Sequence, residues 1–337
     1  MQKSLKRFLG AVLSVSLLGA ACVVAASTVD DDLFAVRRIF PKFGPGLRAL
    51  RRGSDGKYYL LASPNVGVAI LDAQGKQVGS LGSGQQAPSV DKPGSSLIAF
   101  GEDCDIDAQG RIYVADRGRN VVSIFSPDGK LLQSTPANGP ISVVALPEGE
   151  VAISTLRGSH LVTVFGPNGK VAREFGQPED VSTREDLNRY MSQGRLASDA
   201  QGHIYYGYTY LPEPLVRQFD RFGYAGLEFQ FTGLDAFPEA QAARKEVVRQ
   251  EKRTDPPSFL PVITAFGVDP VNGDLWMALH NALLHFDKDG NRLSEYQIYT
   301  KEGARLEAAT ILVEPDRLLI GSDPLGVYDF ERPDRKR

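Results

Sequence analysis

Alternating hydrophobic and polar positions are clearest between residues 103 and 135. The expected elements are an apolar strand ending in an acidic turn at 107–110, and β-rich strands at 111–115, at 121–125 and from Leu131. Pro127 and Gly129 supply a tight turn before the last strand, because proline fixes φ and glycine accepts a positive φ. The pattern predicts one antiparallel sheet of four short strands.

The same order of strands and turns recurs along the chain. Turn glycines before each expected outer strand stand at Gly75, Gly129, Gly169, Gly223 and Gly290, which are 40 to 67 residues apart. A unit of about 40 residues, lengthened by insertions, is typical of a propeller blade. A sixth repeat at 310–330 lacks an outer strand. The alternating segment 34–43 can supply that strand, which would join the two chain ends and remove an unpaired edge.

The stretch at 103–135 resembles an NHL repeat, the unit of a family of β-propellers. The matching residues are Asp107, Gly110, Ile112, Tyr113, Val114, Ala115, Asp116, Asn120, Phe125, Asp128, Gly129 and Lys130. The resemblance implies an all-β fold, a six-bladed β-propeller of four-stranded antiparallel blades. We expect a single domain over residues 34–331, closed by the N-terminal strand pairing with the last blade.

The first 26 residues have the pattern of a secretory signal peptide. Lys3, Lys6 and Arg7 precede an apolar run, and small residues lead to a cleavage position after Ala26. An uncleaved membrane anchor is the alternative, since 8–26 approaches the roughly 20 apolar residues of a spanning helix. Both alternatives place the folded part outside the cytoplasm, in the periplasm or secreted. The acidic residues 30–32 are expected to form a solvated linker.

The two cysteines do not predict an internal disulfide. Cys22 belongs to the expected signal segment, and as a lipid-attachment site it is the weaker interpretation, because Gly19 stands where such a motif usually has leucine. Cys104 then remains alone, and its apolar strand favours a buried packing residue over a nucleophile.

The charge balance limits the classes of partner. The 337-residue chain has a formal net charge of −3, and nucleic acid or an anionic membrane surface would require a basic field. We therefore expect no nucleic-acid partner, and membrane association only through a retained N-terminal segment. No coiled-coil heptad is present, so a monomer is expected.

Connections in a propeller alternate between its two ends. Blade-to-blade connections and second-to-third-strand loops emerge at one end, the insertion face, and the remaining turns emerge at the other end, the turn face. The long connections 82–97, 176–195 and 232–261 all belong to the insertion face, where loops on a rigid scaffold usually build binding surfaces. The short turns predict a plain turn face.

The connection at 232–261 contains a predicted helix that begins at Pro238. Ala240, Ala243 and Val247 give this helix a narrow apolar stripe. We expect a solvated helix packed on the rim, with a partner-binding helix as the alternative.

Candidate ligand-binding residues lie in the second-to-third-strand loops. They are Arg117, Arg119 and Asn120 in blade two, Arg157 and His160 in blade three, Tyr208 and Tyr210 in blade four, and His280 and Asn281 in blade five. Three arginines on adjacent blades would suit carboxylate, sulfate or phosphate groups, because guanidinium forks match these anions. The alternative is that the arginines are only solvated.

An unusual acidic residue lies on the expected inner strand of blade two. Asp105 stands where other inner strands have Ala197 or Gly267. An axis-facing carboxylate of this kind is expected to pair with an arginine, with cation binding as the alternative.

The sequence favours a binding or scaffolding module over an enzyme. The expected ligand is a protein, a peptide or an anionic carbohydrate at the insertion face, with no cofactor. The competing hypothesis is a metal-assisted lyase or hydrolase, resembling amidating lyases, streptogramin lyases or gluconolactonases, with a divalent metal at Asp105, His160 and His280. No H-E-x-x-H or G-x-S-x-G motif supports catalysis.

Overall fold

The fold was analysed in a computed structural model. It describes residues 31–40, 46–62, 67–82, 97–231, 237–253, 255, 258–324 and 326–335. The predicted signal peptide at 1–26 and most of the 82–97 connection lie outside the described residues.

Six sheets form the blades, and in blades one to four the strands follow one another outward in chain order. Blade one has β3 (Leu47–Arg52), β4 (Tyr58–Ala62), β5 (Val68–Leu71) and β6 (Gln77–Leu81). Blade two has β7 (Gly101–Ile106), β8 (Ile112–Asp116), β9 (Val121–Phe125) and β10 (Leu131–Pro136). Blade three has β11 (Pro140–Ala145), β12 (Val151–Thr155), β13 (Val162–Phe165) and β14 (Val171–Phe175). Blade four has β15 (Gly194–Ser198), β16 (Ile204–Tyr208), β17 (Leu215–Phe219) and β18 (Ala225–Gln230).

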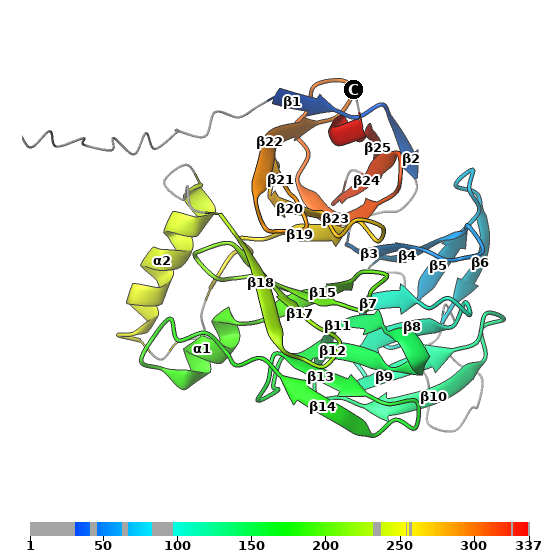
Figure 1. Cartoon of the computed structure of the whole chain (residues 1–337), viewed down its shortest axis with the longest axis horizontal. Helices are drawn as coiled ribbons and strands as arrows, with labels where there is room; N and C mark the ends of the chain where they lie inside the picture. The colour runs from blue at the N-terminus through cyan, green and yellow to red at the C-terminus, as the bar shows by residue number, and fades with distance from the viewer. Residues whose placement is uncertain are drawn as a thin grey trace, which may run out of the picture.

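The last two blades contain both ends of the described chain. Blade five has β19 (Ala265–Val268), β20 (Leu275–Leu279), β21 (Ala282–Phe286), β22 (Arg292–Tyr299) and, at its edge, β1 (Asp31–Phe34). Blade six has β23 (Ala308–Val313), β24 (Arg317–Ser322), β25 (Gly326–Glu331) and β2 (Arg37–Phe40). Neighbouring inner strands contact one another around the whole ring, including β23 with β3 (Figure 1). The structure confirms the predicted six-bladed β-propeller.

The N-terminal segment closes the ring as predicted. Strand β2 pairs antiparallel with β25 and places Phe40 opposite Val327. The expectation of a solvated linker was wrong for Asp31 and Asp32, because β1 pairs in parallel with β22 as a fifth strand. Both carboxylates are exposed, while the buried Leu33 anchors β1 to the sheet.

A repeated aspartate shapes the turns at the ends of the inner strands. Asp107 accepts hydrogen bonds from the backbone N–H groups of Gln109 (3.0 Å) and Arg111 (2.8 Å) and from the Tyr113 hydroxyl (3.0 Å). Gly110 completes this turn with a φ of 76°, which other residues rarely adopt. The same arrangement recurs in blade four, where Asp199 accepts from the Tyr205 hydroxyl at 3.0 Å. The matching residues of the repeat pattern thus have a structural role.

Buried apolar side chains fill the spaces between the sheets, and Cys104 is one of them. It has no exposed surface, and burial raises the pKa of its thiol above the usual range. This confirms a packing role, because the reactive form of cysteine is the thiolate.

Two α-helices lie in the blade-to-blade connections. Helix α2 (Pro238–Gln250) begins at Pro238 as predicted and buries Ala240, Ala243 and Val247. Helix α1 (Glu185–Met191), between blades three and four, was not predicted. Short 3₁₀ turns are η1 (Pro147–Gly149) and η3 (Pro333–Arg335). Among the described residues, neither helix has the length and apolar character required to cross a membrane.

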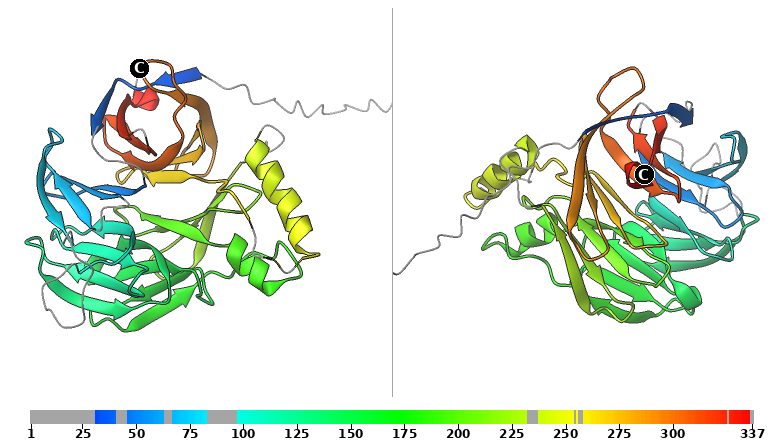
Figure 2. Two further views of the ribbon diagram at one scale, coloured as in Figure 1. Left: turned by 180° about the vertical axis from the view of Figure 1, so that it is seen from behind. Right: turned by 45° about the horizontal axis from the view of Figure 1, so that its top comes forward.

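The two connections brace each other beside blade four. The guanidinium of Arg184, which precedes α1, donates hydrogen bonds to the backbone carbonyl oxygens of Gln250 (2.6 Å) and Arg253 (2.5 Å). Helix α1 accordingly lies near the C-terminal end of α2 (Figure 2).

Replacing Phe40 by alanine should test the closure. Phe40 is 2% exposed and packs against the Tyr58 ring at 5.4 Å, so its loss is expected to cost about 3–5 kcal/mol of unfolding free energy. Phe34→Ala is the matched control, because Phe34 is 51% exposed and its ring stacks on the Tyr299 ring at the edge of blade five. Urea denaturation should show a loss of about 1 kcal/mol for this control. Equal losses would contradict closure through β2.

Candidate functional site

The candidate site lies on the propeller axis at the insertion face. Inner strands begin at this face, and Arg48, Glu102 and Arg195 are each the second residue of an inner strand. In blades one and two the pairing register shifts at this position, so Arg48 and Glu102 are the extra residues of β-bulges. Bulges re-aim side chains and are common beside functional sites.

Three arginines contact Glu102, two through its carboxylate and one through its backbone oxygen. Glu102 is 6% exposed, and its Oε1 lies 2.7 Å from Nε of Arg117 while its Oε2 pairs with Arg48. Arg195 donates to the backbone oxygen of Glu102 at 3.4 Å. The guanidinium carbons of Arg48 and Arg117 lie 4.5 and 4.8 Å from the ring centre of Phe100. We call Arg48, Arg117 and Arg195, with Glu102 and Phe100, the arginine cluster.

A second layer of charges lies deeper along the inner strands. Arg51 pairs with Asp103 at 3.0 Å and with Asp105 at 3.5 Å. Asp103 also accepts a hydrogen bond from the Ser142 hydroxyl at 2.5 Å. The cavity between the inner strands has a volume of only about 30 Å³, which is room for one or two water molecules. This cavity is too small to admit anything much larger than water.

Asp105 pairs with an arginine, as the sequence predicted. Its Oδ2 accepts a hydrogen bond from the backbone N–H of Ala145 at 2.8 Å. Burial raises the pKa of Asp105 to about 6, although the Arg51 charge and the hydrogen bond from Ala145 act in the opposite direction.

An aromatic group flanks the arginine cluster on the side of blade four. The ring of Tyr190 in α1 lies 5.3 Å from that of Tyr210 and 5.6 Å from that of Phe259. Burial is the main cause of the raised pKa of Tyr210, and the charges of Arg195 and Glu102 also influence it. Tyr210 therefore lies close to the arginine cluster. We call Tyr190, Tyr210 and Phe259 the aromatic wall.

The candidates in blades two and three have different environments. Arg117 belongs to the arginine cluster, whereas Arg119 donates to the carbonyl oxygen of Leu97 at 2.9 Å. Asn120 has a φ of 55° and its side chain accepts from the backbone N–H of Gly139 at 3.0 Å. Arg157 is exposed, and Nδ1 of His160 lies 3.1 Å from the Ser159 hydroxyl.

The candidates in blades four and five are also separated. Tyr208 is fully buried, and its hydroxyl donates to Glu179 at 3.0 Å, so its ring is not part of the insertion-face surface. Nε2 of His280 donates to the carbonyl oxygen of Pro261 at 2.9 Å, and Asn281 donates to Gln297. Of the nine candidates, Arg117 and Tyr210 are the ones that the structure brings to the axis.

Sequence reasoning missed Arg48, Phe100 and Arg195. Strand β3 was not predicted, because its three arginines obscure the apolar alternation, and the expected β15 began one residue after Arg195. The sequence signal that could have identified Arg48 and Arg195 is a charged residue near the start of several inner strands.

The metal candidates do not meet. Asp105, His160 and His280 each have the separate partners described above. Within the described ranges, a different group could share an ion. It consists of Asp274, His285 and Asp334 and lies at the turn face.

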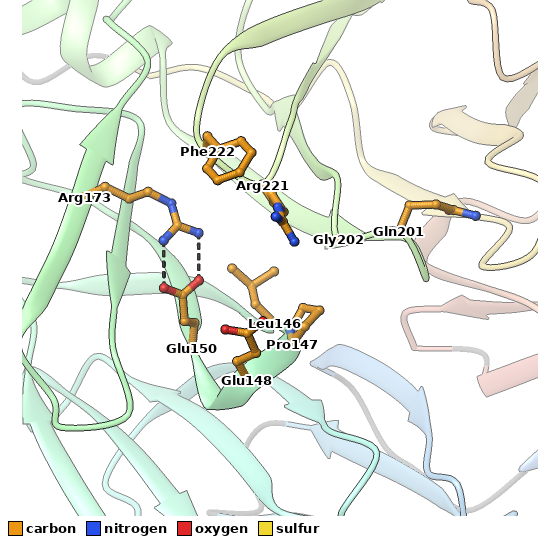
Figure 3. A pocket seen from close by; sticks show the side chains of 9 residues that line it. All are labelled: Leu146, Pro147, Glu148, Glu150, Arg173, Gln201, Gly202, Arg221 and Phe222. Atoms are coloured by element: carbon orange, nitrogen blue, oxygen red, sulfur yellow. Dashed lines mark hydrogen bonds and ion pairs between the residues drawn. The ribbon is translucent and has the colours of Figure 1, made fainter.

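The expectation of a plain turn face was wrong. Its turns are short, but a cavity of about 210 Å³ lies between blades three and four (Figure 3). Arg173 and Glu150 form two parallel 2.8 Å hydrogen bonds beside it, and Arg221 and the 61% exposed Phe222 line it. The volume is below the roughly 300–1,000 Å³ of ordinary ligand pockets.

Comparisons with known proteins support the fold and no finer assignment. No family model matches the chain, and no curated protein matches it by sequence. A gluconolactonase from Xanthomonas campestris is similar in structure, with a TM-score of 0.56, 16% identity and 88% of each chain covered. A streptogramin B lyase gives a TM-score of 0.53 and 14% identity, with 88% of this chain and 86% of that chain covered. An inactive virginiamycin B lyase from Staphylococcus aureus gives 0.52 and 10%, with 86% and 96% covered. At these identities the similarity shows the propeller fold alone.

Replacing Asp105 by asparagine should change how stability depends on pH. The carboxyl has a pKa of about 6 in the folded protein and 3.8 ordinarily, so ionisation of Asp105 destabilises the folded state progressively between pH 4 and 6. That shift corresponds to about 3 kcal/mol. Urea denaturation should show Asp105→Asn equal to the unsubstituted protein near pH 4 and more stable at pH 7. A variant that becomes relatively less stable as the pH rises would contradict this.

Proposed function

We propose that this chain is a binding propeller whose arginine cluster recognises an anionic group of its ligand. The observation that carries the proposal is the gathering of three arginines around one acidic residue: Arg48 and Arg117 pair with the carboxylate of Glu102, and Arg195 donates to its backbone oxygen. The cluster therefore has a surplus of positive charge. A guanidinium has five N–H donors, so the arginines retain donors for a second carboxylate or a sulfate.

Accessibility supports the same proposal. The side chains of Arg48 and Arg117 are 26% and 41% exposed, so both are fixed by partners and still reachable from solvent. Fixed guanidinium groups lose less conformational freedom on binding an anion than solvated ones.

The aromatic wall favours a ligand that also has an apolar face. Tyr190 and Phe259 come from two insertions, and Tyr190 packs against both Phe259 and Tyr210, on which the charge of Arg195 acts. Aromatic faces next to guanidinium groups suit a ligand that combines an anionic group with an apolar ring face. Among the expected partners, an acidic carbohydrate such as a uronic-acid oligomer satisfies both requirements, and an acidic peptide satisfies the first.

The cellular setting forms part of the proposal. The pattern of residues 1–26 supports an extracytoplasmic protein, periplasmic or secreted, and the repeat pattern supports membership in the NHL-repeat family. Carbohydrates and peptides of the cell envelope are ligands available in that setting.

Replacing Arg195 by alanine should weaken binding of a short oligogalacturonate by about 10-fold or more, since hydrogen bonds to charged groups contribute about 1.5–3 kcal/mol. Arg157→Ala is the matched control, because Arg157 is an exposed arginine of the insertion face outside the cluster. It should change the dissociation constant less than twofold by isothermal titration calorimetry. A neutral galactan oligomer of equal length should not bind. Equal losses in the two variants would contradict recognition by the cluster.

The lyase or hydrolase hypothesis makes a different prediction at this face. It requires a divalent metal at Asp105, His160 and His280, and His280 would first have to release the Pro261 carbonyl oxygen. Metal analysis of His280→Ala separates the two hypotheses, because loss of a stoichiometric metal in this variant would favour the enzyme.

A further inference from the structure

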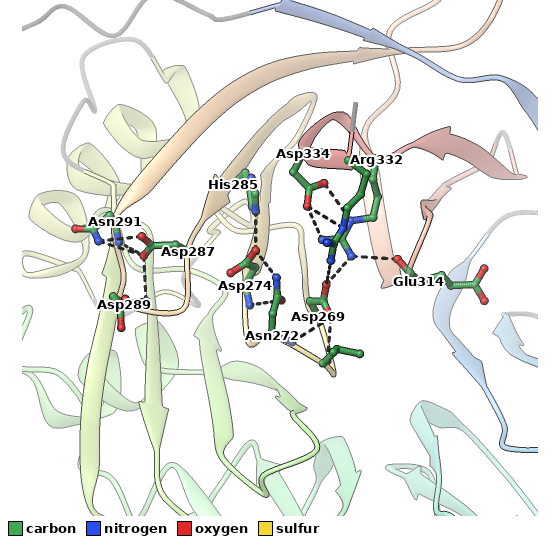
Figure 4. A network of polar contacts seen from close by, with 12 residues as sticks. Asp269, Asn272, Asp274, His285, Asp287, Asp289, Asn291, Glu314, Arg332 and Asp334 are labelled. Atoms are coloured by element: carbon green, nitrogen blue, oxygen red, sulfur yellow. Dashed lines mark hydrogen bonds and ion pairs between the residues drawn. The ribbon is translucent and has the colours of Figure 1, made fainter. Parts of the chain in front are cut away.

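Three side chains that can bind a metal meet at the turn face, far along the chain from one another. Asp274 precedes β20, His285 lies on β21, and Asp334 belongs to the C-terminal turn η3. One nitrogen or oxygen atom from each lies within 4.8 Å of the other two. Figure 4 shows His285 pointing toward Asp274, with Asp334 beside them.

The described part of the fold gives Nε2 of His285 no hydrogen-bond partner. The residue is 1% exposed, and its ring stacks on Trp276 with a centroid distance of 3.9 Å. Its Nε2 is buried and lies 3.5 Å from Oδ2 of Asp274, outside good hydrogen-bond geometry, and it has no hydrogen-bond partner among the described residues. A buried polar atom without a partner is costly.

Neighbouring groups hold both carboxylates in place. The side-chain amide of Asn272 donates to Oδ2 of Asp274 at 2.7 Å. Arg332 is 1% exposed and donates to both oxygens of Asp334, at 3.1 and 2.7 Å. Such outer contacts orient metal ligands in known sites.

The charge of the group leaves room for a cation. Arg332 also pairs with Asp269 at 2.5 Å, and Arg335 lies 3.6–3.7 Å from Asp334 and Asp269. Three carboxylates therefore face two guanidinium groups, which leaves one negative charge uncompensated.

We propose that Asp274, His285 and Asp334 bind one Zn²⁺ ion at the turn face. An imidazole with two carboxylates suits zinc, whereas Ca²⁺ and Mg²⁺ prefer oxygen ligands alone. Zinc–ligand bonds of about 2 Å place the ligands of a tetrahedral site about 3.3 Å apart, so the three atoms, which lie within 4.8 Å of one another, would have to approach. The ion would link η3, through Asp334, to blade five, through Asp274 and His285. This site is independent of the arginine cluster.

Zinc binding to the untagged full chain, stripped with a chelator, tests the proposal. We expect one zinc per chain by mass spectrometry of bound metal, a higher melting temperature with zinc, and no such effect of calcium. His285→Ala and Asp334→Asn should each weaken zinc binding by about 100-fold or more, because loss of an outer-shell partner alone costs about 10–100-fold. Asp334→Asn keeps the test valid if His285→Ala folds poorly, because Asp334 lies in the terminal turn.

His203→Ala is the matched control for zinc binding. His203 also lies at the turn face, with Nδ1 2.7 Å from Asp199, and this variant should keep full zinc affinity. A wild-type chain that takes up no stoichiometric zinc, or variants of His285 and Asp334 that retain it, would overturn the proposal. Zinc lost in His280→Ala but kept in His285→Ala would place the metal at the insertion face instead.

Discussion

The pairing of β2 with β25 is the constraint on which the rest of the structure depends. A propeller has no central core, and each blade is held mainly by its two neighbours. The seam between the first and last blades must therefore be closed by the chain itself. Here one short N-terminal strand supplies the outer strand of blade six, and β1 extends the tie to blade five. With the ring closed, six inner strands face one axis, and charged residues from blades one, two and four can converge there.

The inner strands turn this closed ring into a site. β-Bulges at the second position of the strands in blades one and two present Arg48 and Glu102 to the axis. Deeper ion pairs between Arg51, Asp103 and Asp105 fill the channel below them. The result is a shallow opening with an excess of positive charge, at the end of the axis where the inner strands begin. Long insertions with aromatic side chains border this opening, and the opposite end carries a separate acidic and histidine group.

The sequence was sufficient for the fold because turn chemistry repeats in it. Aspartate, glycine and tyrosine at fixed spacing mark the ends of the inner strands, and most predicted strands agree with the observed ones within two residues. The site was harder to predict. Loop position identified the correct face for Arg117 and Tyr210, but it does not report distance from the axis. Arg48 and Arg195 lie on inner strands, where arginine breaks the apolar pattern, and only their neighbours in space explain them.

Hydrogen exchange with and without a saturating uronic-acid oligomer tests the central claim most directly. The account predicts slower exchange of backbone amides at 100–103, 117–119 and 194–196, around the mouth of the axis. Protection confined to 147–150 and 201–203, beside the turn-face cavity, would contradict the account.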